Sequence, residues 1–247
     1  MKKMKKILVI AVLMIASLNV MNAQTINFGV KAGLNLADVS GSPSASSSIG
    51  GETSSYSNGM HIGFHIGAVC NIALNDNFSI APELLYSQGG YKQTYTFTDD
   101  GSFSGVKETN TTVSNVSLNY LQIPIMAHYK LESGLYFEAG LYFGILLSAS
   151  NHETGTFNET SPVAFNASSD TTSSNDSALN KVDFGLAFGV GYQLPMGLAF
   201  NVRYDLGLTS LVKSQTYGTA PYTVTEPAWG KNGIIQISIS YMFGMAK

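Results

Sequence analysis

Residues 60–74 read MHIGFHIGAVCNIAL. Apolar side chains occupy the even positions of this stretch, from Met60 to Leu74, whereas glycine, histidine and asparagine take most of the odd positions. Because successive side chains of a β-strand point to opposite faces, a strand over these residues has one apolar face and one small or polar face. Such a strand fits a barrel with lipid outside and a polar interior.

Seven further stretches show the same alternation, at residues 25–36, 78–91, 116–131, 135–147, 181–194, 198–208 and 233–243. Each reaches the roughly 9 to 11 residues that a tilted membrane strand needs. Short turns at 75–77, 132–134 and 195–197 alternate with long loops at about 38–59, 92–115, 148–180 and 209–232. Outer-membrane barrels with short periplasmic turns and periplasmic termini show this rhythm. The sequence therefore predicts one all-β domain over residues 24–247, an eight-stranded antiparallel up-and-down transmembrane β-barrel.

The small residues indicate which face of the strands lies inside. A soluble barrel of the lipocalin type would turn the apolar face inward and the other face to water. Nine glycines lie on the non-apolar face, at positions 29, 33, 63, 67, 140, 144, 185, 189 and 191. The narrow interior of an eight-stranded barrel has little room for side chains, so glycines belong there. Pro124 lies within a predicted strand, where we expect irregular pairing because proline lacks a backbone N–H.

The first 23 residues read as a secretory signal peptide. Four lysines precede an apolar run from Ile7 to Leu18, and Ala23 fits a cleavage site. The apolar run is shorter than the roughly 20 residues of a membrane-spanning helix. We expect the mature chain to begin at Gln24.

Composition narrows the class of protein. Charged residues make up 12% of the chain, compared with roughly 25% in ordinary soluble domains. Without the four leader lysines, nine basic residues remain against 16 acidic ones, which argues against nucleic acid as a partner. Cys70 is the only cysteine, so the chain has no disulfide framework. We expect a monomer whose surroundings are outer-membrane lipid.

Few charges face the predicted interior, and these form the candidate site: Lys31, Glu83, Glu138, Asp183, Arg203 and Asp205. Buried charges require partners. Counting along the strands places Lys31, Glu83 and Arg203 at similar heights, which predicts an ion-pair network that fills the lumen. Across the turn at Ser133, His128 should lie opposite Glu138 as a second contact. A path for protons or ions is the alternative that these residues leave open.

Signals for catalysis or metal binding are weak. His61 and His65 lie four positions apart on one strand, roughly 13 Å at 3.3 Å per residue, too far for one ion. Ser148, His152 and Glu153 are close in the third loop, but a serine, a histidine and an acid make no triad without geometry. The sequence therefore predicts no catalytic, cofactor-binding or metal-ligating residue and no cofactor. An outer-membrane enzyme is the less favoured alternative.

The fourth long loop is the most aromatic, with Tyr217, Tyr222 and Trp229. Exposed aromatic side chains anchor interfaces, so we expect a contact with a partner there. Alternatively, Trp229 belongs to the aromatic girdle at the membrane interface.

Seven motifs carry a family resemblance: GVKAGLN (29–35), PELLYSQGG (82–90), YLQIP (120–124), GLYFG (140–144), DFG (183–185), RYDLGL (203–208) and YMF (241–243). With these motifs the chain resembles the PorT-like outer-membrane β-barrel family of the Bacteroidetes. The resemblance implies an outer-membrane barrel and no single activity, although the best-known relative is needed for a protein secretion system. We therefore expect a non-enzymatic structural or interaction barrel with a side-chain-filled lumen, accessory to envelope or secretion functions. A narrow channel for ions or very small solutes is the alternative.

Overall fold

The computed structural model describes residues 25–41, 46–102, 105–160, 164–174, 177–219 and 222–244, so the expected signal peptide lies outside the described residues. The described residues form thirteen β-strands: β1 (Ile26–Ser40), β2 (Ser46–Ile49), β3 (Glu52–Gly59), β4 (His61–Ala73), β5 (Phe78–Asp99), β6 (Lys107–Lys130), β7 (Leu135–Thr160), β8 (Phe165–Ser173), β9 (Val182–Gln193), β10 (Leu198–Gly207), β11 (Gln215–Thr219), β12 (Tyr222–Glu226) and β13 (Lys231–Met242). Over these residues, no helix combines the length and apolar character that crossing a membrane requires.

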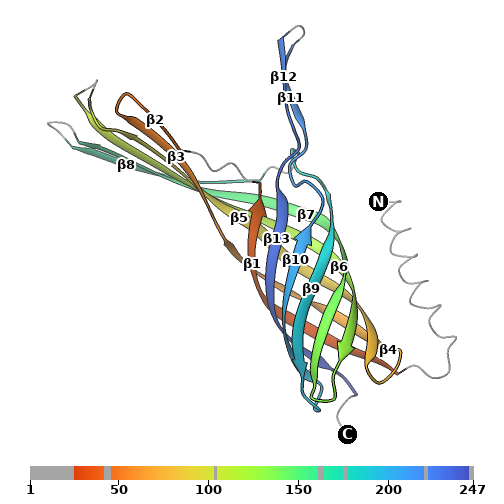
Figure 1. Cartoon of the computed structure of the whole chain (residues 1–247). Coiled ribbons are helices and arrows are strands. Elements are labelled where there is room, and N and C mark those ends of the chain that lie inside the picture. The colour runs from red at the N-terminus through yellow and green to blue at the C-terminus, as the bar shows by residue number, and fades with distance from the viewer. Residues whose placement is uncertain are drawn as a thin grey trace.

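Eight of the strands pair into a closed ring, which is the barrel seen in Figure 1. Their order around the ring is β1-β4-β5-β6-β7-β9-β10-β13, and β13 pairs back to β1. Every pair in the ring is antiparallel. Apart from β13 closing on β1, each strand pairs with the next ring strand along the chain, as in an up-and-down barrel. The predicted fold class is therefore confirmed.

Side chains of the ring strands alternate between an apolar outer surface and a polar interior. On β4, Ile62, Phe64 and Ile66 are 69%, 46% and 55% exposed, whereas His61 and His65 are only 6% and 1% exposed. The strands β9 and β10 show the same alternation of exposed and buried positions. The glycine-bearing face therefore lies inside, as the crowding of an eight-stranded interior requires.

The four predicted long loops are largely wrong, because they contain regular strands. β5 continues to Asp99, β6 begins at Lys107 and β7 continues to Thr160, while β2, β3, β8, β11 and β12 occupy the remaining loop ranges. Segments such as TYTFT (94–98) alternate hydroxyl and aromatic side chains with period two. Threonine and aromatic residues favour strands, so serine- and threonine-rich composition alone was a poor guide to loops.

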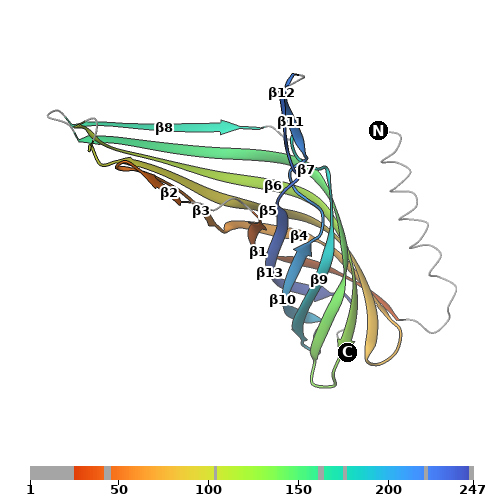
Figure 2. The same ribbon diagram turned by 45° about the horizontal axis from the view of Figure 1, so that its top comes forward.

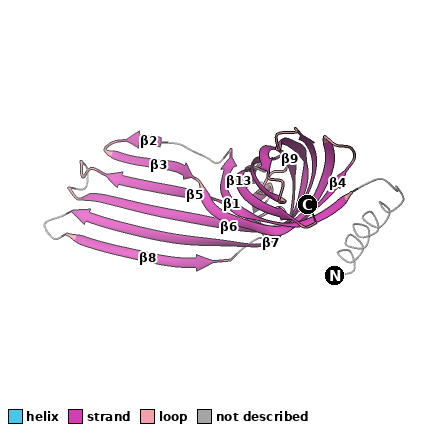
Figure 3. Ribbon diagram, turned by 90° about the horizontal axis from the view of Figure 1, so that it is seen from below, coloured by secondary structure: helices cyan, strands magenta, loops and turns pink. Residues whose placement is uncertain are grey.

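Six of these strands form a second structural feature, which we call the extension. It comprises residues 46–59, 91–99, 107–116, 151–160 and 165–173, paired in the order β2-β3-β5-β6-β7-β8. Figures 2 and 3 show it as a sheet that projects sideways from one wall of the barrel. The hairpin of β11 and β12 stands apart from it above the barrel (Figure 1).

Two irregularities mark the junction between barrel and extension. On β7, Leu147 is an extra residue, because Asn119 pairs with Ser148 while Tyr120 pairs with Leu146. On β5, Gly90 has a φ of 139°. A bulge such as that at Leu147 bends its strand, and it lies where the extension turns away from the ring. At Pro124 the pairing of β5 and β6 is also interrupted, since it runs to Pro82 opposite Ile125 and resumes at Leu85 opposite Gln122.

Candidate functional site

Four charged side chains meet in the middle of the lumen. The Arg203 guanidinium donates to Glu83 through Nη1 (2.9 Å to Oε2) and Nη2 (2.7 Å to Oε1). The same group donates to Glu138 through Nε (2.7 Å to Oε1) and Nη2 (3.0 Å to Oε2). Lys31 Nζ lies 3.2 Å from Glu83 Oε1. All four residues are at least 96% buried. We call this set the charge layer.

The charge layer is built from alternate strands of the ring. Lys31 stands on β1, Glu83 on β5, Glu138 on β7 and Arg203 on β10, and one ring strand separates each from the next. Inward side chains of alternate strands share a level in a tilted barrel, so four strands can supply one layer. Two positive and two negative groups balance, as buried charges require.

Two further side chains, Asn201 and His128, contact Glu138. Asn201 Nδ2 donates to Glu138 Oε1 at 2.9 Å. His128 pairs with Glu138 across β6 and β7, and its Nε2 lies 3.2 Å from Glu138 Oε2. The structure thus brings together five of the seven sequence-predicted lumen residues: Lys31, Glu83, His128, Glu138 and Arg203.

The remaining two predicted lumen residues lie in separate contacts. Asp205 Oδ2 accepts from Gln122 Nε2 at 2.9 Å. Asp183 Oδ2 accepts from Asn232 Nδ2 at 2.9 Å and from the Tyr142 hydroxyl at 3.1 Å. Neither carboxylate has a hydrogen bond or ion pair to the charge layer among the described residues.

Sequence reasoning missed a neutral network on the adjacent strands. His65 lies between Asn35 and Ser238, with Nδ1 2.7 Å from Asn35 Oδ1 and Nε2 2.8 Å from Ser238 Oγ. Asn35 Nδ2 also donates to Ser87 Oγ at 3.0 Å. The inward positions of these residues were visible in the alternation, but their heights depend on the stagger between strands, which the alternation does not give.

An apolar cluster closes the lumen at the end nearest the extension. Its buried members are Val39, Leu118, Tyr120, Leu146, Ala149 and Leu211, and Tyr91, Val116, Leu179, Val212 and Trp229 pack against them. Backbone bonds from Leu211 N to Gly230 O (2.6 Å) and from Asn180 N to Leu211 O (2.8 Å) tie three chain segments into this cap. Sequence reasoning missed the cap because its members come from seven separate segments of the chain.

Trp229, one of the three aromatic residues expected to make outer contacts, is part of the cap. Trp229 is half-buried against the apolar cluster, so it packs at the mouth of the lumen instead of standing free or in an interface girdle. Tyr217 and Tyr222 lie on the hairpin, where Tyr217 pairs with Val224 and Tyr222 with Thr219.

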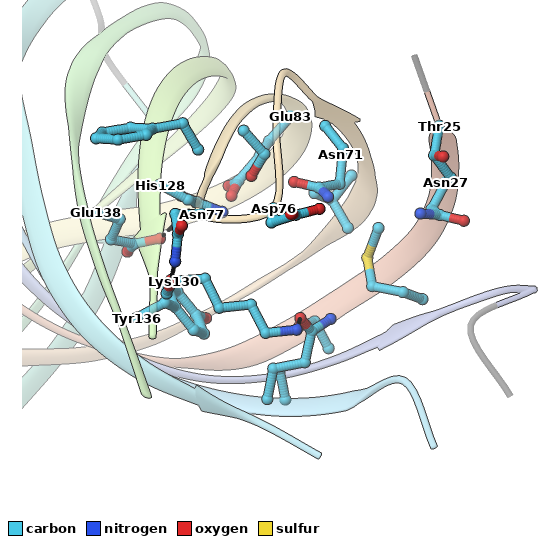
Figure 4. Close-up of a pocket in the computed structure, with 18 of the residues that line it drawn as sticks. Thr25, Asn27, Asn71, Asp76, Asn77, Glu83, His128, Lys130, Tyr136 and Glu138 are labelled. Carbon is cyan, nitrogen blue, oxygen red and sulfur yellow. Dashed lines mark hydrogen bonds and ion pairs between the residues drawn. The ribbon is translucent and has the colours of Figure 1, made fainter. Parts of the chain in front are cut away.

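The opposite end of the lumen, where the short turns lie, holds a cavity of about 270 Å³. Its lining includes Thr25, the turn at 75–77 and Met242, and it reaches inward to Lys31, Glu83 and Glu138. Figure 4 shows Glu83, His128 and Glu138 among the lining side chains, together with Lys130 and with Asp76 of the turn. Water-sized solutes can therefore approach the charge layer from the turn end, whereas the cap covers the other end.

The residues weighed for metal binding and catalysis are not assembled into one site. His61 Nδ1 lies 2.8 Å from Asn115 Oδ1, and His65 belongs to the neutral network. Ser148 accepts from Asn119 Nδ2 at 3.0 Å at the edge of the barrel. His152 and Glu153 are successive residues of β7, so their side chains point to opposite faces of the extension.

The chain is similar to solved outer-membrane structures at low identity. Ail, the attachment invasion locus protein of Yersinia pestis, is 9% identical, with a TM-score of 0.39, covering 88% of this chain and 98% of that one. OprG from Pseudomonas aeruginosa is 14% identical, with a TM-score of 0.38 and coverages of 89% and 97%. Outer membrane protein W of E. coli is 15% identical, with a TM-score of 0.34 and coverages of 88% and 97%. No curated protein matches significantly.

A protein-family model also matches most of the chain. The model of the family described as outer membrane protein beta-barrel domain matches residues 22–213, more than half of the chain. This match agrees with the closed antiparallel ring and its apolar outer surface. The chain therefore belongs to the family of outer membrane protein beta-barrel domains.

Proposed function

We propose that this protein is a non-enzymatic, non-conducting barrel that anchors the extension and the hairpin at the outer membrane. Its role in this proposal is structural or interactive, accessory to envelope or secretion functions, as in the PorT-like barrels of the Bacteroidetes that it resembles. The mature chain starts at Gln24 and functions as a monomer. The turn end faces the periplasm with both termini, and the extension lies outside the cell.

The observation that carries the closed lumen is the reach of Arg203. From β10 its guanidinium contacts carboxylates on β5 and β7, so charged side chains cross the interior at one level. The apolar cap adds a second barrier. An eight-stranded interior is just wide enough for side chains, which leaves little room for a continuous water path.

Planar-bilayer recording tests the closed lumen. We expect purified wild-type protein to give no stable conductance. A known porin purified by the same procedure is the positive control. A reproducible unitary conductance in the wild-type protein would overturn the proposal. The Arg203→Ala variant distinguishes two roles for the charge layer. If it conducts while its thermal unfolding is unchanged, the layer acts as a gate and not as a brace.

A narrow channel for ions or very small solutes is the second candidate, and the turn-end cavity favours it. This cavity already brings solvent to Lys31, Glu83 and Glu138. The rest of a path would run through the charge layer, the buried polar contacts of Asp183 and Asp205, and the cap. Conductance that appears in Arg203→Ala only when the cap is also weakened, as in Leu211→Ser, would support two gates in series.

The proposed orientation is tested by labelling single cysteines on intact cells. In a Cys70→Ser background, Thr96→Cys in the extension should react with a membrane-impermeant maleimide, whereas Asn77→Cys at a short turn should react only after the outer membrane is opened. The reverse pattern would overturn the orientation. Both positions lie outside the apolar belt. Asn77→Cys removes the hydrogen bond from Asn77 Nδ2 to Lys130 O (2.9 Å), so heat-modified migration on gels must show that this variant keeps its barrel.

A further inference from the structure

The extension is a single sheet whose two faces differ sharply in chemistry. One face, which we call the lumen-side face, continues the inward surface of β5 and β6 and carries Tyr56, Tyr95, Phe97, Phe157 and Phe165. The opposite face carries mainly hydroxyls: Ser55, Ser57, Thr94, Thr96, Thr98, Thr109, Thr111, Thr154, Thr156 and Thr172. Among the described residues of the extension, every Phe and Tyr on β3, β5, β7 and β8 lies on the lumen-side face.

The aromatic side chains on the lumen-side face form two pairs that are open to solvent. The ring centroids of Tyr56 and Tyr95 are 4.6 Å apart, and those of Phe157 and Phe165 are 6.3 Å apart. Tyr56 is 43% and Phe165 57% exposed. Phe97 shares a cross-strand row with Asn110 and Phe157. No other described strand covers this face of the extension, so its apolar area is available to a partner.

Charge is segregated between the two faces in the same way. Glu52, Asp99, Glu108, Glu153 and Glu159 lie on the lumen-side face of β3, β5, β6 and β7. Four of them stand directly opposite one another in a row across the strands, from Glu52 to Asp99, Glu108 and Glu159. The two lysines of the extension, Lys92 and Lys107, lie on the opposite face. Like charges directly opposite each other on a sheet are destabilising.

These charges discriminate between occupants of the lumen-side face. A second copy stacked face to face would bring two sets of five carboxylates together, and an anionic membrane surface would meet the same repulsion. A basic partner relieves it. Arginine suits this surface best, because its guanidinium binds carboxylates and also stacks on aromatic rings.

We propose that the lumen-side face of the extension binds a basic, arginine-rich segment of a partner protein. The aromatic pairs supply cation–π and apolar contact, and the acidic row supplies ion pairs. The inference rests on the proposed function of a membrane anchor that presents the extension. The two fail separately, because a wild-type conductance would overturn the closed lumen without changing binding at this face.

The test measures the anisotropy of a fluorescent peptide of alternating Arg and Ser titrated with full-length protein in zwitterionic detergent, at about 0.1 M salt. We expect Tyr95→Ser/Phe157→Ser to weaken binding by about tenfold. The matched control is Thr96→Ala/Thr156→Ala, which changes the neighbouring residues of the same strands on the opposite face and should leave binding within about twofold of wild type.

A second pair of variants tests the electrostatic contribution to peptide binding. Glu159→Gln and Asp170→Asn each remove one negative charge from the extension, but Asp170 lies on the face opposite Glu159. Glu159→Gln should weaken binding several-fold more than Asp170→Asn. Heat-modified migration on gels verifies that each variant keeps its barrel.

Three results would overturn the proposal. Equal losses of affinity in Glu159→Gln and Asp170→Asn would mean that net charge alone attracts the peptide. Unchanged affinity in Tyr95→Ser/Phe157→Ser would mean that the aromatic side chains do not contact it. The third is tight binding of neutral maltohexaose with no binding of the arginine peptide, which would identify a glycan surface instead. A peptide of alternating Glu and Ser serves as the charge-reversed probe and should not bind.

Discussion

Arg203 on β10 donates two hydrogen bonds to Glu83 on β5, the strand directly across the ring. The two residues are 120 positions apart in the chain. Their contact therefore forms only when the barrel is closed, and it joins opposite walls in a single bidentate pair. Such pairs add directional constraint to charge attraction. The lumen of this barrel is thus braced across its middle.

Removing the brace should cost much of the barrel's stability. Arg203→Leu leaves Glu83 and Glu138 buried with only Lys31 as an ionic partner of the charge layer, and unpaired buried charge costs about 3–5 kcal/mol. We expect the midpoint of urea unfolding in detergent to fall accordingly. The triple variant Arg203→Leu/Glu83→Gln/Glu138→Gln, which removes the uncompensated charges, should recover part of the loss. An unchanged midpoint for Arg203→Leu would show that the layer is not a brace.

Two inward glycines should respond differently to the same small substitution. A Cβ at Gly189 would lie 2.8 Å from Glu138 Oε1 and 2.5 Å from Val202 O, whereas one at Gly144 would meet no described atom closer than 3.4 Å. Gly189→Ala should therefore displace the charge layer and destabilise the barrel by about 1–3 kcal/mol, the usual cost of overpacking. Gly144→Ala should remain near wild type in the same urea titration. Similar unfolding curves for the two variants would contradict this account.

The boundary of the lipid-exposed surface should be detectable by arginine substitution. Val202 lies midway along β10, 48% exposed, with Val190 and Ile237 as its outward neighbours. Val202→Arg should cost about 2–4 kcal/mol, as charge does at the midplane of the lipid face of a barrel. Thr96→Arg on the extension should cost little, because that face meets water. Folding efficiency into liposomes measures both, and equal efficiencies would place the membrane boundary elsewhere.

The cap has a built-in reporter, since Trp229 is the chain's only tryptophan. Its packing against the cluster that includes Leu211 predicts a blue-shifted emission and weak quenching by acrylamide. Leu211→Ser should open the cap, shift the emission to the red and raise quenching several-fold, while leaving the barrel folded. Emission typical of exposed tryptophan in the wild-type protein would place Trp229 outside the cap.

The alternation predicted the barrel strands well because it reports directly on a membrane barrel's two environments. Phe64 and His65 are adjacent in sequence, yet one is exposed outside and the other buried inside. The same reading failed for residues 92–115, where serine, threonine and asparagine suggested loops. There both faces meet water, and the aromatic alternation of TYTFT (94–98) spans only five residues among many serines, threonines and asparagines. Backbone pairing with neighbouring strands decides the structure of this segment.

For the candidate site, too, the sequence predicted some features and only the tertiary structure showed the others. The sequence by itself determined that Lys31, Glu83, Glu138 and Arg203 point inward, because period two assigns faces without knowledge of neighbours. It also placed His128 opposite Glu138, since a short turn sets the register of a hairpin. Only the tertiary structure decided that Arg203 bridges Glu83 and Glu138, that Asp183 and Asp205 stand apart, and that Trp229 closes the mouth. These contacts depend on strand stagger and ring closure, which are properties of the whole barrel and not of any one strand.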